Sequence, residues 1–403
     1  MLLSKSDVLE YVEQEDVKFI RLAFCDVFGV QKNISVMPSE LEGAFEDGVA
    51  FDASQVSGFG SVETSDLYLF PDPSTLTVLP WRSTHGKVVR LFCSVRYPDG
   101  TPFEMDNRSV LLRAVQALRE KGLQCSIGSE FEFYLFETDE NGAPTKTPHD
   151  HATYLDIAPE DRGENVRREI CLTLEEMGIH PECSHHEVGP GQHEIDFRQS
   201  DPMTAADNAV TFKSVVRTIA ARNGLWACFD PKPLPDFPGN GMHINISLAG
   251  TDGRDYRMAF MAGILRRTRE MTAFLNPSND SYLRFGKNKA PRYISWSSGN
   301  RSQLIRIPSG GNRIELRSPD ASLNPYLAYA LLIFAGLEGI DENLVPDSPA
   351  DINLYQADYS TTMNYSRLPD SYEEAIRIAQ ESDFVQRVIP EKTFSAYREL
   401  HGF

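Results

Sequence analysis

The sequence predicts an α/β or α+β protein in which helices pack outside a curved sheet. The first hundred residues favour strands, expected at 17–22 and 87–97 with turn-rich sequence between them. After a strong turn at 97–102, strands alternate with segments of helical spacing. Some strands follow one another closely, so antiparallel neighbours are expected. The helical segments are expected at 106–122, 163–179, 203–223, 256–276, 324–338 and 371–388.

Length and composition limit the possible classes of protein. A chain of 403 residues favours two domains, and the turn at 97–102 divides it into 1–102 and 103–403. The net charge of −19 argues against binding to nucleic acid or to anionic membranes. No apolar run reaches about 18 residues, so no membrane span is expected.

The beginning of the chain and its cysteines indicate a cytoplasmic protein. The first residues are acidic and lack the apolar stretch of a secretory signal. The six cysteines are scattered and form no CxxC pair. Such cysteines are typical of reduced residues in the interior, rather than of a disulfide framework or a zinc site.

Polar side chains alternate with apolar ones in five short segments that read as strands. Because strand side chains have a period of two, each polar set shares one face. Several such rows, separated by helices, predict one polar cavity. The rows are 128–133 with Glu130 and Glu132, 191–197 with Glu194 and nearby Glu187, 242–248 with His243, Asn245 and Ser247, 301–308 with Arg301 and Arg306, and 313–317 with Glu315 between two arginines.

The acidic rows predict a site for divalent cations. Carboxylates that lie a few ångströms apart repel one another unless a cation compensates them. Mg²⁺ and Mn²⁺ prefer oxygen ligands, and an imidazole is compatible with Mn²⁺. Arginines facing two such ions suit phosphoryl transfer. The candidate ligands are Glu130, Glu132, Glu187, Glu194, His243 and Glu315.

Each row also has an ordinary structural explanation. A single Glu-x-Glu strand is usually a solvated face, and a single histidine such as His243 is more often structural. Arg313, Glu315 and Arg317 could form a surface ladder of ion pairs. The same alternation recurs in several strands, which favours the shared site over a coincidence of separate explanations.

These residues resemble the glutamine synthetase family from about residue 15 to residue 390. Several independent motifs occur in the family's order. They are Phe51-Asp52-Ala53-Ser54 with Ser65-Asp66, Gly128-Ser129-Glu130-Phe131-Glu132, His185-His186-Glu187-Val188 through Gly191-Gln192-His193-Glu194, Gly239-Asn240-Gly241-Met242-His243, Asn300-Arg301-Ser302 through Arg306-Ile307-Pro308, Arg313-Ile314-Glu315-Leu316-Arg317-Ser318-Pro319-Asp320, and Asn324-Pro325-Tyr326.

The resemblance implies an α+β fold with an N-terminal β-grasp domain. The catalytic domain would have a curved, mainly antiparallel sheet backed by helices. It also implies a homo-oligomeric ring with active sites between neighbouring subunits. Such enzymes phosphorylate the γ-carboxylate of glutamate with ATP, and ammonia, or an amine in sister enzymes, then displaces the phosphate.

Matched to the family's motifs, individual residues acquire expected roles. Glu132, Glu187 and Glu194 would bind one metal ion, and Glu130, His243 and Glu315 the other. Arg301 would act on the transferred phosphate. The nucleotide would be bound by Glu182, Ser247, Arg306 and Arg313, and glutamate by Gly239, Arg284 and Arg317. Asp52 and Tyr154 would line the ammonium pocket, with Asp52 supplied by the adjacent subunit.

The chain departs from the family at the flap that closes over the site. A glutamate of the family is replaced by Lys289 in the sequence Lys287-Asn288-Lys289-Ala290-Pro291. A lysine repels ammonium, so a γ-glutamyl-amine ligase that uses a primary amine is the alternative. Pro238, beside Gly239, leaves open an acid other than glutamate. An inactive scaffold is the alternative of another class, although all six metal-matching positions are retained.

Overall fold

The computed structural model describes residues 3–60, 62–82, 86–400 and 402. The chain folds into two compact units. One comprises residues 1–112, 175–179 and 389–403, and the other comprises residues 113–174 and 180–388. Each unit is described by itself below, and α3 (Asn107–Glu120) contains the first boundary between them.

The first unit is built on a six-stranded sheet in which β1 and β6 lie side by side and parallel. The strand order is β2-β1-β6-β4-β3, with β5 paired to β6, and the other pairs are antiparallel. Its strands are β1 (Val17–Cys25), β2 (Gln31–Val36), β3 (Val49–Asp52), β4 (Asp66–Pro71), β5 (Thr77–Val78) and β6 (Lys87–Arg96), and its helices are α1 (Lys5–Gln14), α2 (Leu41–Glu46) and α11 (Glu391–Glu399).

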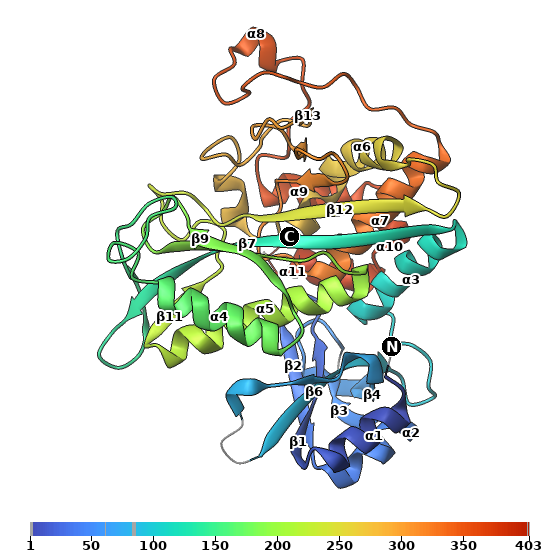
Figure 1. Ribbon diagram of the computed structural model, residues 1–403. Coiled ribbons are helices and arrows are strands. Elements are labelled where there is room, and N and C mark those ends of the chain that lie inside the picture. Colours follow the sequence, from blue (N-terminus) through green and yellow to red (C-terminus); the bar gives the residue numbers. More distant parts are fainter. Residues whose placement is uncertain (1–2, 61, 83–85, 401, 403) are drawn as a thin grey trace. The chain divides into compact units, whose positions relative to one another are not determined.

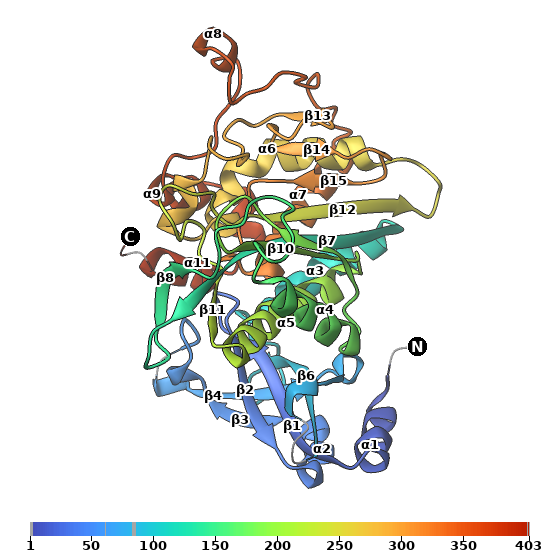
Figure 2. The same ribbon diagram turned by 60° about the vertical axis from the view of Figure 1, so that its left-hand side comes forward.

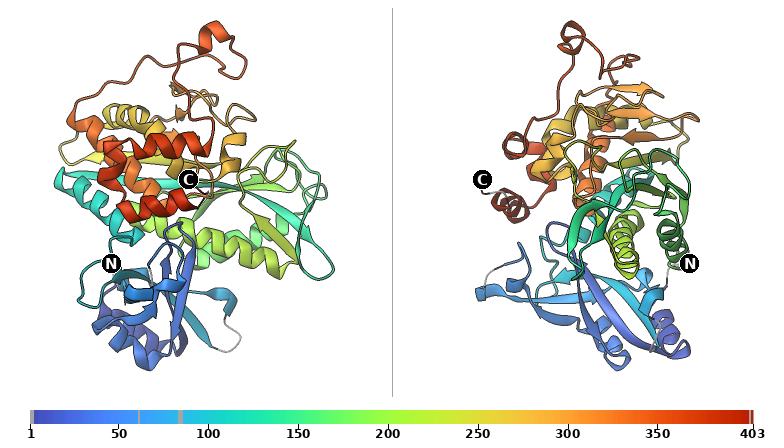
Figure 3. Two further views of the ribbon diagram at one scale, coloured as in Figure 1. Left: turned by 180° about the vertical axis from the view of Figure 1, so that it is seen from behind. Right: turned by 90° about the vertical axis from the view of Figure 1, so that its left-hand side faces the viewer.

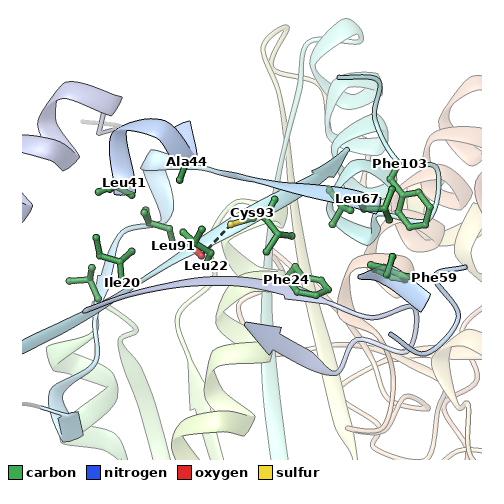
Figure 4. Packing of buried hydrophobic residues seen from close by; sticks show 14 of the residues in the cluster. Ile20, Leu22, Phe24, Leu41, Ala44, Phe59, Leu67, Leu91, Cys93 and Phe103 are labelled. Carbon is green, nitrogen blue, oxygen red and sulfur yellow. Dashed lines mark hydrogen bonds between the residues drawn. The ribbon is translucent and has the colours of Figure 1, made fainter. Parts of the chain in front are cut away.

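Apolar side chains from this sheet and from α2 form the core of the first unit (Figure 4). Leu22 and Leu91 lie on the central parallel strands and are fully buried. The sequence did not predict α1, although Ser4 and Asp7 form a capping box at its start. It also did not predict that α11 returns to this unit, where Tyr397 packs against Phe28.

The second unit is built on a nine-stranded sheet in which β7 is central. The strand order is β13-β14-β15-β12-β7-β10-β9, with β8 and β11 also paired to β7, and Figure 2 shows the row from β13 to β10. Among the described strands of this sheet, only β13 and β14 pair in parallel. The strands are β7 (Leu123–Thr138), β8 (Pro144–Pro148), β9 (Pro181–His186), β10 (Gln192–Phe197), β11 (Leu225–Cys228), β12 (Met242–Gly250), β13 (Trp296–Ser298), β14 (Ile305–Ile307) and β15 (Ile314–Leu316).

Helices pack against the sheet of the second unit. Figure 3 shows α6 and α7 side by side, and α5 contacts both β7 and α7. Helix α7 is almost entirely apolar and buried, as expected for a helix enclosed by other elements. The helices are α4 (Glu164–Glu176), α5 (Pro202–Arg222), α6 (Arg257–Leu275), α7 (Pro325–Asp341), α8 (Tyr359–Thr362), α9 (Tyr372–Gln380) and α10 (Asp383–Val388).

The expected elements agree with the structure except at two points. The helix expected at 371–388 is two helices, α9 and α10, because the helical conformation is interrupted at residues 381–382. The strand expected at 301–308 is confined to Ile305–Ile307, and Arg301 lies in a turn before it. The segment between α7 and α9, which carries α8, extends away from the sheet (Figure 1). Among the described residues, each helix is too short or too polar to cross a bilayer.

Candidate active site

The acidic residues of three strands meet on one face of the second sheet. Strand β7 lies between β10 and β12, as Figure 1 shows for β7 and β12. Glu132 pairs with Glu194 across β7 and β10, and Glu130 pairs with His243 across β7 and β12. Residues that are directly opposite on paired strands point to the same face. The period of two therefore brings these four side chains together, as the sequence predicts.

The distances define two overlapping groups of metal-binding atoms. Glu130, Glu194 and His243 each offer one ligand atom, and these atoms lie within 4.8 Å of one another. His185, Glu187 and Glu194 form a second such group within the same distance. Glu194 belongs to both groups, so its carboxylate is placed where it could hold a cation in either of them.

Several hydrogen bonds hold these carboxylates in place. The Oε1 atom of Glu130 accepts a hydrogen bond of 2.8 Å from Asn245, and its Oε2 atom lies 2.9 Å from Nδ1 of His243. The Oε2 atom of Glu132 accepts a bond of 2.6 Å from the amide of Gly241. Side chains held in this way are pre-organised for a ligand and do not need to be ordered by it.

The pKa values of the acidic residues reflect their crowding. Burial, together with the charges of Glu132 and Asp196, raises the pKa of Glu194 well above its usual range. Burial and the charge of Glu130 raise the pKa of Asp196 to about 7. Burial also opposes ionisation of Glu130, but the hydrogen bond and charge of His243 outweigh it and lower its pKa to about 2.

The residues present fit a hard divalent cation. One carboxylate oxygen of Asp196 is buried and has no hydrogen-bond partner within the described part of the chain. Like-charged carboxylates at this density are stabilised by a cation, and carboxylates with one imidazole suit Mg²⁺ or Mn²⁺. The site therefore supplies both the negative charge and the type of ligand atom that such ions require.

Glu315 differs from the other acidic residues because arginines already compensate its charge. It is fully buried and accepts a hydrogen bond of 2.6 Å from Nε of Arg306, and it also accepts one from Arg317. Nδ1 of His243 lies 3.9 Å from its Oε1 atom. Glu315 thus connects the histidine of the acidic cluster to the two arginines.

Two cavities meet at the acidic cluster. The first, of about 570 Å³, contains the acidic residues together with Tyr154, Gly239, Arg284, Lys289 and Arg301. The second, of about 530 Å³, is lined by Glu182, Ser247 and the segment 308–313. Glu130, Asp196 and Arg313 line both cavities. Ligands in the two cavities would therefore approach each other at these shared residues.

Gly239 lies where no larger residue fits. A Cβ atom at this position would be 2.2 Å from the carbonyl oxygen of Pro231 and 2.7 Å from Cγ of Arg284. Arg284 is only 4 % exposed and donates to the carbonyl oxygen of Ser318 at 3.0 Å. The close approach of the glycine loop to this arginine shapes one wall of the first cavity.

The segment with Lys289 borders the same cavity. Asn288 and Lys289 both have positive φ angles, which mark a tight turn. Nζ of Lys289 lies 5.1 Å from the ring centroid of Tyr154, and its carbonyl oxygen accepts a bond of 3.5 Å from Arg317. The side chain of Lys289 therefore lines the first cavity, and a lysine occupies the position that the sequence predicts for this segment.

Asp52 lies in the first unit, at the end of β3. Its carboxylate caps the short 3-10 helix Ala53–Gln55 and accepts hydrogen bonds from the amide of Ser54 at 3.0 Å and from its hydroxyl group at 2.6 Å. Asp52 is exposed. Its expected place in a neighbouring subunit's site stays a prediction.

Sequence reasoning gave no role to Asp196, His185 or Lys232, which line the first cavity. Asp196 was detectable, because it follows Glu194 by two residues and therefore shares its face. His185 lies in the motif His185-His186-Glu187-Val188, but only Glu187 of that motif was expected to bind a metal ion. Lys232 lies in an irregular segment, where no periodic pattern distinguishes it from a surface lysine.

Comparisons with known proteins agree on one family. Residues 16–98 match the family model described as glutamine synthetase, beta-Grasp domain, and residues 104–402 match the one described as glutamine synthetase, catalytic domain. The chain is 46% identical over 413 residues to a glutamine synthetase of Methanosarcina mazei, covering 98% of this chain and 92% of that protein. It is 43% identical over 412 residues to that of Clostridium saccharobutylicum, covering 98% and 93%.

Solved structures have the same fold. A structure of GmaS in complex with ADP is similar with a TM-score of 0.88 and 27% identity, covering 98% of this chain and 94% of that one. The cryo-EM structure of a Plasmodium falciparum glutamine synthetase is similar with a TM-score of 0.86 and 22% identity, covering 98% and 95%. The second likeness concerns the fold alone.

Proposed function

Because this chain belongs to the glutamine synthetase family, we propose that it is an ATP-dependent ligase that makes glutamine from glutamate and ammonia. The reaction phosphorylates the γ-carboxylate of glutamate, and ammonia then displaces the phosphate. The observation that carries the proposal is the acidic cluster at the junction of two cavities. Phosphoryl transfer needs such an arrangement, because donor and acceptor must meet where charge is compensated.

Two divalent cations, Mg²⁺ or Mn²⁺, are proposed to bind to the six metal-matching residues. When bound, such ions neutralise the phosphate charge and polarise the transferred group. Glu132, Glu187 and Glu194 are assigned to one ion. Glu130, His243 and Glu315 are assigned to the other. Asn245 and Gly241 hold two of these carboxylates by hydrogen bonds, so they orient ligands rather than bind the ion.

The second cavity is proposed to hold ATP. Its lining carries Glu182 and Ser247, suited to polar groups of the nucleoside, and Arg313, suited to phosphate. Arg306 lies on β14 within reach of the acidic cluster, where its guanidinium is fixed by Glu315. A guanidinium fixed in this way costs little entropy when phosphate binds beside it.

The first cavity is proposed to hold glutamate. Arg284 and Arg317 would pair with the carboxylates of the substrate, while Gly239 would let its amino-acid head approach the backbone. Arg301 is exposed at the cavity and would neutralise the charge that develops on the transferred phosphoryl group. Lys289 and Tyr154 border the place from which the nucleophile enters, and Asp52 of an adjacent subunit would complete it.

The assembly and location of the enzyme are part of the same proposal. We assign the β-grasp domain to residues 1–102 and the catalytic domain to residues 103–403. Subunits would form a ring with active sites between neighbours. Four of the six cysteines, Cys25, Cys93, Cys125 and Cys228, are buried, which fits the reduced interior cysteines of a cytoplasmic protein. Neither a nucleic acid nor a membrane is needed for this activity.

A steady-state assay of phosphate release tests the function. The full-length oligomer would be supplied with ATP, glutamate and either Mg²⁺ or Mn²⁺, with ammonium or methylamine as nucleophile. Release that requires glutamate and is stimulated by ammonium is the expected result. Stimulation by methylamine alone would replace the proposal with an amine ligase. Absence of glutamate-dependent release with every nucleophile would favour the inactive scaffold.

A further inference from the structure

A buried polar network lies directly behind the acidic cluster. It consists of Asp150, Asp161, Arg167, His186 and His193, each at most 7 % exposed. His186 and His193 face each other across β9 and β10, with ring centroids 4.9 Å apart. Both strands also carry or adjoin residues of the cavity, because Glu187 follows His186 and Glu194 follows His193.

Both ring nitrogens of His186 point at oxygen atoms. Its Nε2 atom lies 2.9 Å from Oδ1 of Asp150, and its Nδ1 atom lies 2.6 Å from the carbonyl oxygen of Glu187. Oxygens of a carboxylate and a carbonyl group only accept, so each ring nitrogen is placed to donate a hydrogen bond to one of them.

The Asp150 carboxylate is anchored to backbone amides. It accepts from the amides of Gly191 at 2.9 Å, Arg162 at 3.2 Å and Ala152 at 3.3 Å. A buried carboxylate with this many partners is fixed in position. The histidine that it binds is therefore held at one end by Asp150 and holds the backbone of Glu187 at the other.

The geometry argues against a metal ion in this network, although Asp150, Asp161, His186 and His193 offer four ligand atoms within 4.8 Å. The guanidinium of Arg167 already lies among these ligand atoms, because its Nη1 atom is 2.8 Å from Asp161 and 2.9 Å from Nδ1 of His193. A metal ion bound to Nδ1 of His193 would therefore have to displace this guanidinium.

We propose that Asp150 and His186 form a buried positioning pair that sets the backbone at Glu187 and thereby aims its carboxylate at the cation site. The amide of Val188 belongs to the same peptide group as the carbonyl of Glu187 and donates to one carboxylate oxygen of Glu187 at 2.9 Å, so the peptide group that follows Glu187 is restrained through both of its polar atoms. His186 touches no substrate in this account and acts through Glu187. The inference rests on the proposed cation site.

Two substitutions of His186 separate its contacts. His186→Gln keeps a donor near the Nε2 position, toward Asp150, and loses the donor to the Glu187 carbonyl. His186→Asn keeps a donor near the Nδ1 position and loses the contact with Asp150. Mn²⁺ binding to the full-length oligomer without substrates would be measured by electron paramagnetic resonance. We expect His186→Gln to raise the Mn²⁺ dissociation constant by about 10- to 100-fold, and His186→Asn to raise it less.

Asp161→Asn is the matched control for a purely structural role. Asp161 is as buried as Asp150 and belongs to the same network, but it contacts Arg167 and Gly163 rather than Glu187. The Asp161→Asn substitution should lower the melting temperature and leave the Mn²⁺ dissociation constant unchanged. Equal loss of Mn²⁺ binding in all three variants, or unchanged binding in His186→Gln, would overturn the positioning role. If the unaltered protein binds no Mn²⁺, the proposed cation site itself fails.

Discussion

At the scale of single residues, the structure predicts that Glu194 supports activity but lowers the stability of the cation-free protein. Its carboxylate is buried among Glu132, Glu187 and Asp196, which raise its pKa. Without a cation this crowding is unfavourable, so Glu194→Gln should stabilise the cation-free protein by about 1 kcal/mol, the equivalent of less than one pKa unit. The same change removes a ligand and should lower activity by at least about 100-fold.

Thermal unfolding in a chelating buffer and phosphate release with Mg²⁺ would check both effects. Glu140→Gln serves as the control for the second measurement, because Glu140 is exposed in the turn between β7 and β8 and lines neither cavity. A Glu194→Gln protein that is less stable than the unaltered one in chelator would contradict the crowding argument.

Lys289 gives a second prediction at this scale. Its ammonium group is exposed beside Tyr154, where an approaching ammonium ion would meet a like charge. An exposed unit charge is worth about 1 kcal/mol at short range, which corresponds to roughly a fivefold change in an equilibrium constant. Lys289→Met should therefore lower the KM for ammonium by about fivefold, and Lys289→Glu should lower it further.

The measurement is the KM for ammonium at low and at high ionic strength. An electrostatic effect shrinks as salt increases, whereas a change in loop structure does not. The KM for ATP serves as an internal control. An unchanged KM for ammonium in both variants would show that Lys289 does not face the entering nucleophile.

At the scale of elements, the period of two accounts for how well the acidic face could be predicted. Glu130, Glu132, Glu194 and His243 lie in strands whose alternation is visible within seven residues, and strand pairing then aligns them. The buried network was not predictable in this way. Asp150 and His186 are 36 residues apart, and each looks like an ordinary polar residue until the fold brings them together.

Turns limited the prediction elsewhere. Arg301 was expected on a strand because two arginines flank apolar residues there, but only Ile305–Ile307 is a strand. A turn at residues 300–303 exposes Arg301 while Arg306 remains on the strand. Local pattern cannot distinguish these two cases, since both place a charged residue beside apolar ones.

The contact between α6 and α7 gives a prediction for packing. An added Cβ atom at Gly263 in α6 would lie 2.0 Å from the carbonyl oxygen of Ala335 in α7, which is backbone and cannot move aside. Gly263→Ala should therefore cost about 1–3 kcal/mol of unfolding free energy. A Cβ atom at Gly43 in α2 would meet no atom of the described residues within 4 Å, so Gly43→Ala should add up to about 1 kcal/mol of unfolding free energy.

Urea unfolding followed by circular dichroism measures both changes. The two substitutions are chemically identical and both lie in helices, so helix propensity favours alanine in each. Changes of opposite sign in the unfolding free energy would therefore reflect only the close packing of α6 and α7. Stabilisation by Gly263→Ala would show that these helices can separate without cost.

At the scale of the whole molecule, Asp52 and the acidic cluster belong to different units of the chain. The proposed ring would supply Asp52 to a site from an adjacent subunit. Mixed oligomers of Asp52→Ala and Glu194→Gln subunits test this. In a randomly mixed ring at equal ratio, about a quarter of the sites combine an intact Glu194 with a neighbour's intact Asp52.

Each variant alone should be nearly inactive, while the co-expressed mixture should recover about a quarter of the activity. The recovered activity should depend on the ratio of subunits and be greatest when they are equal, because every working site needs one subunit of each kind. Separately purified variants that are combined without exchange of subunits provide the control. A mixture no more active than its two components would mean that each site takes Asp52 from its own chain, or does not use it.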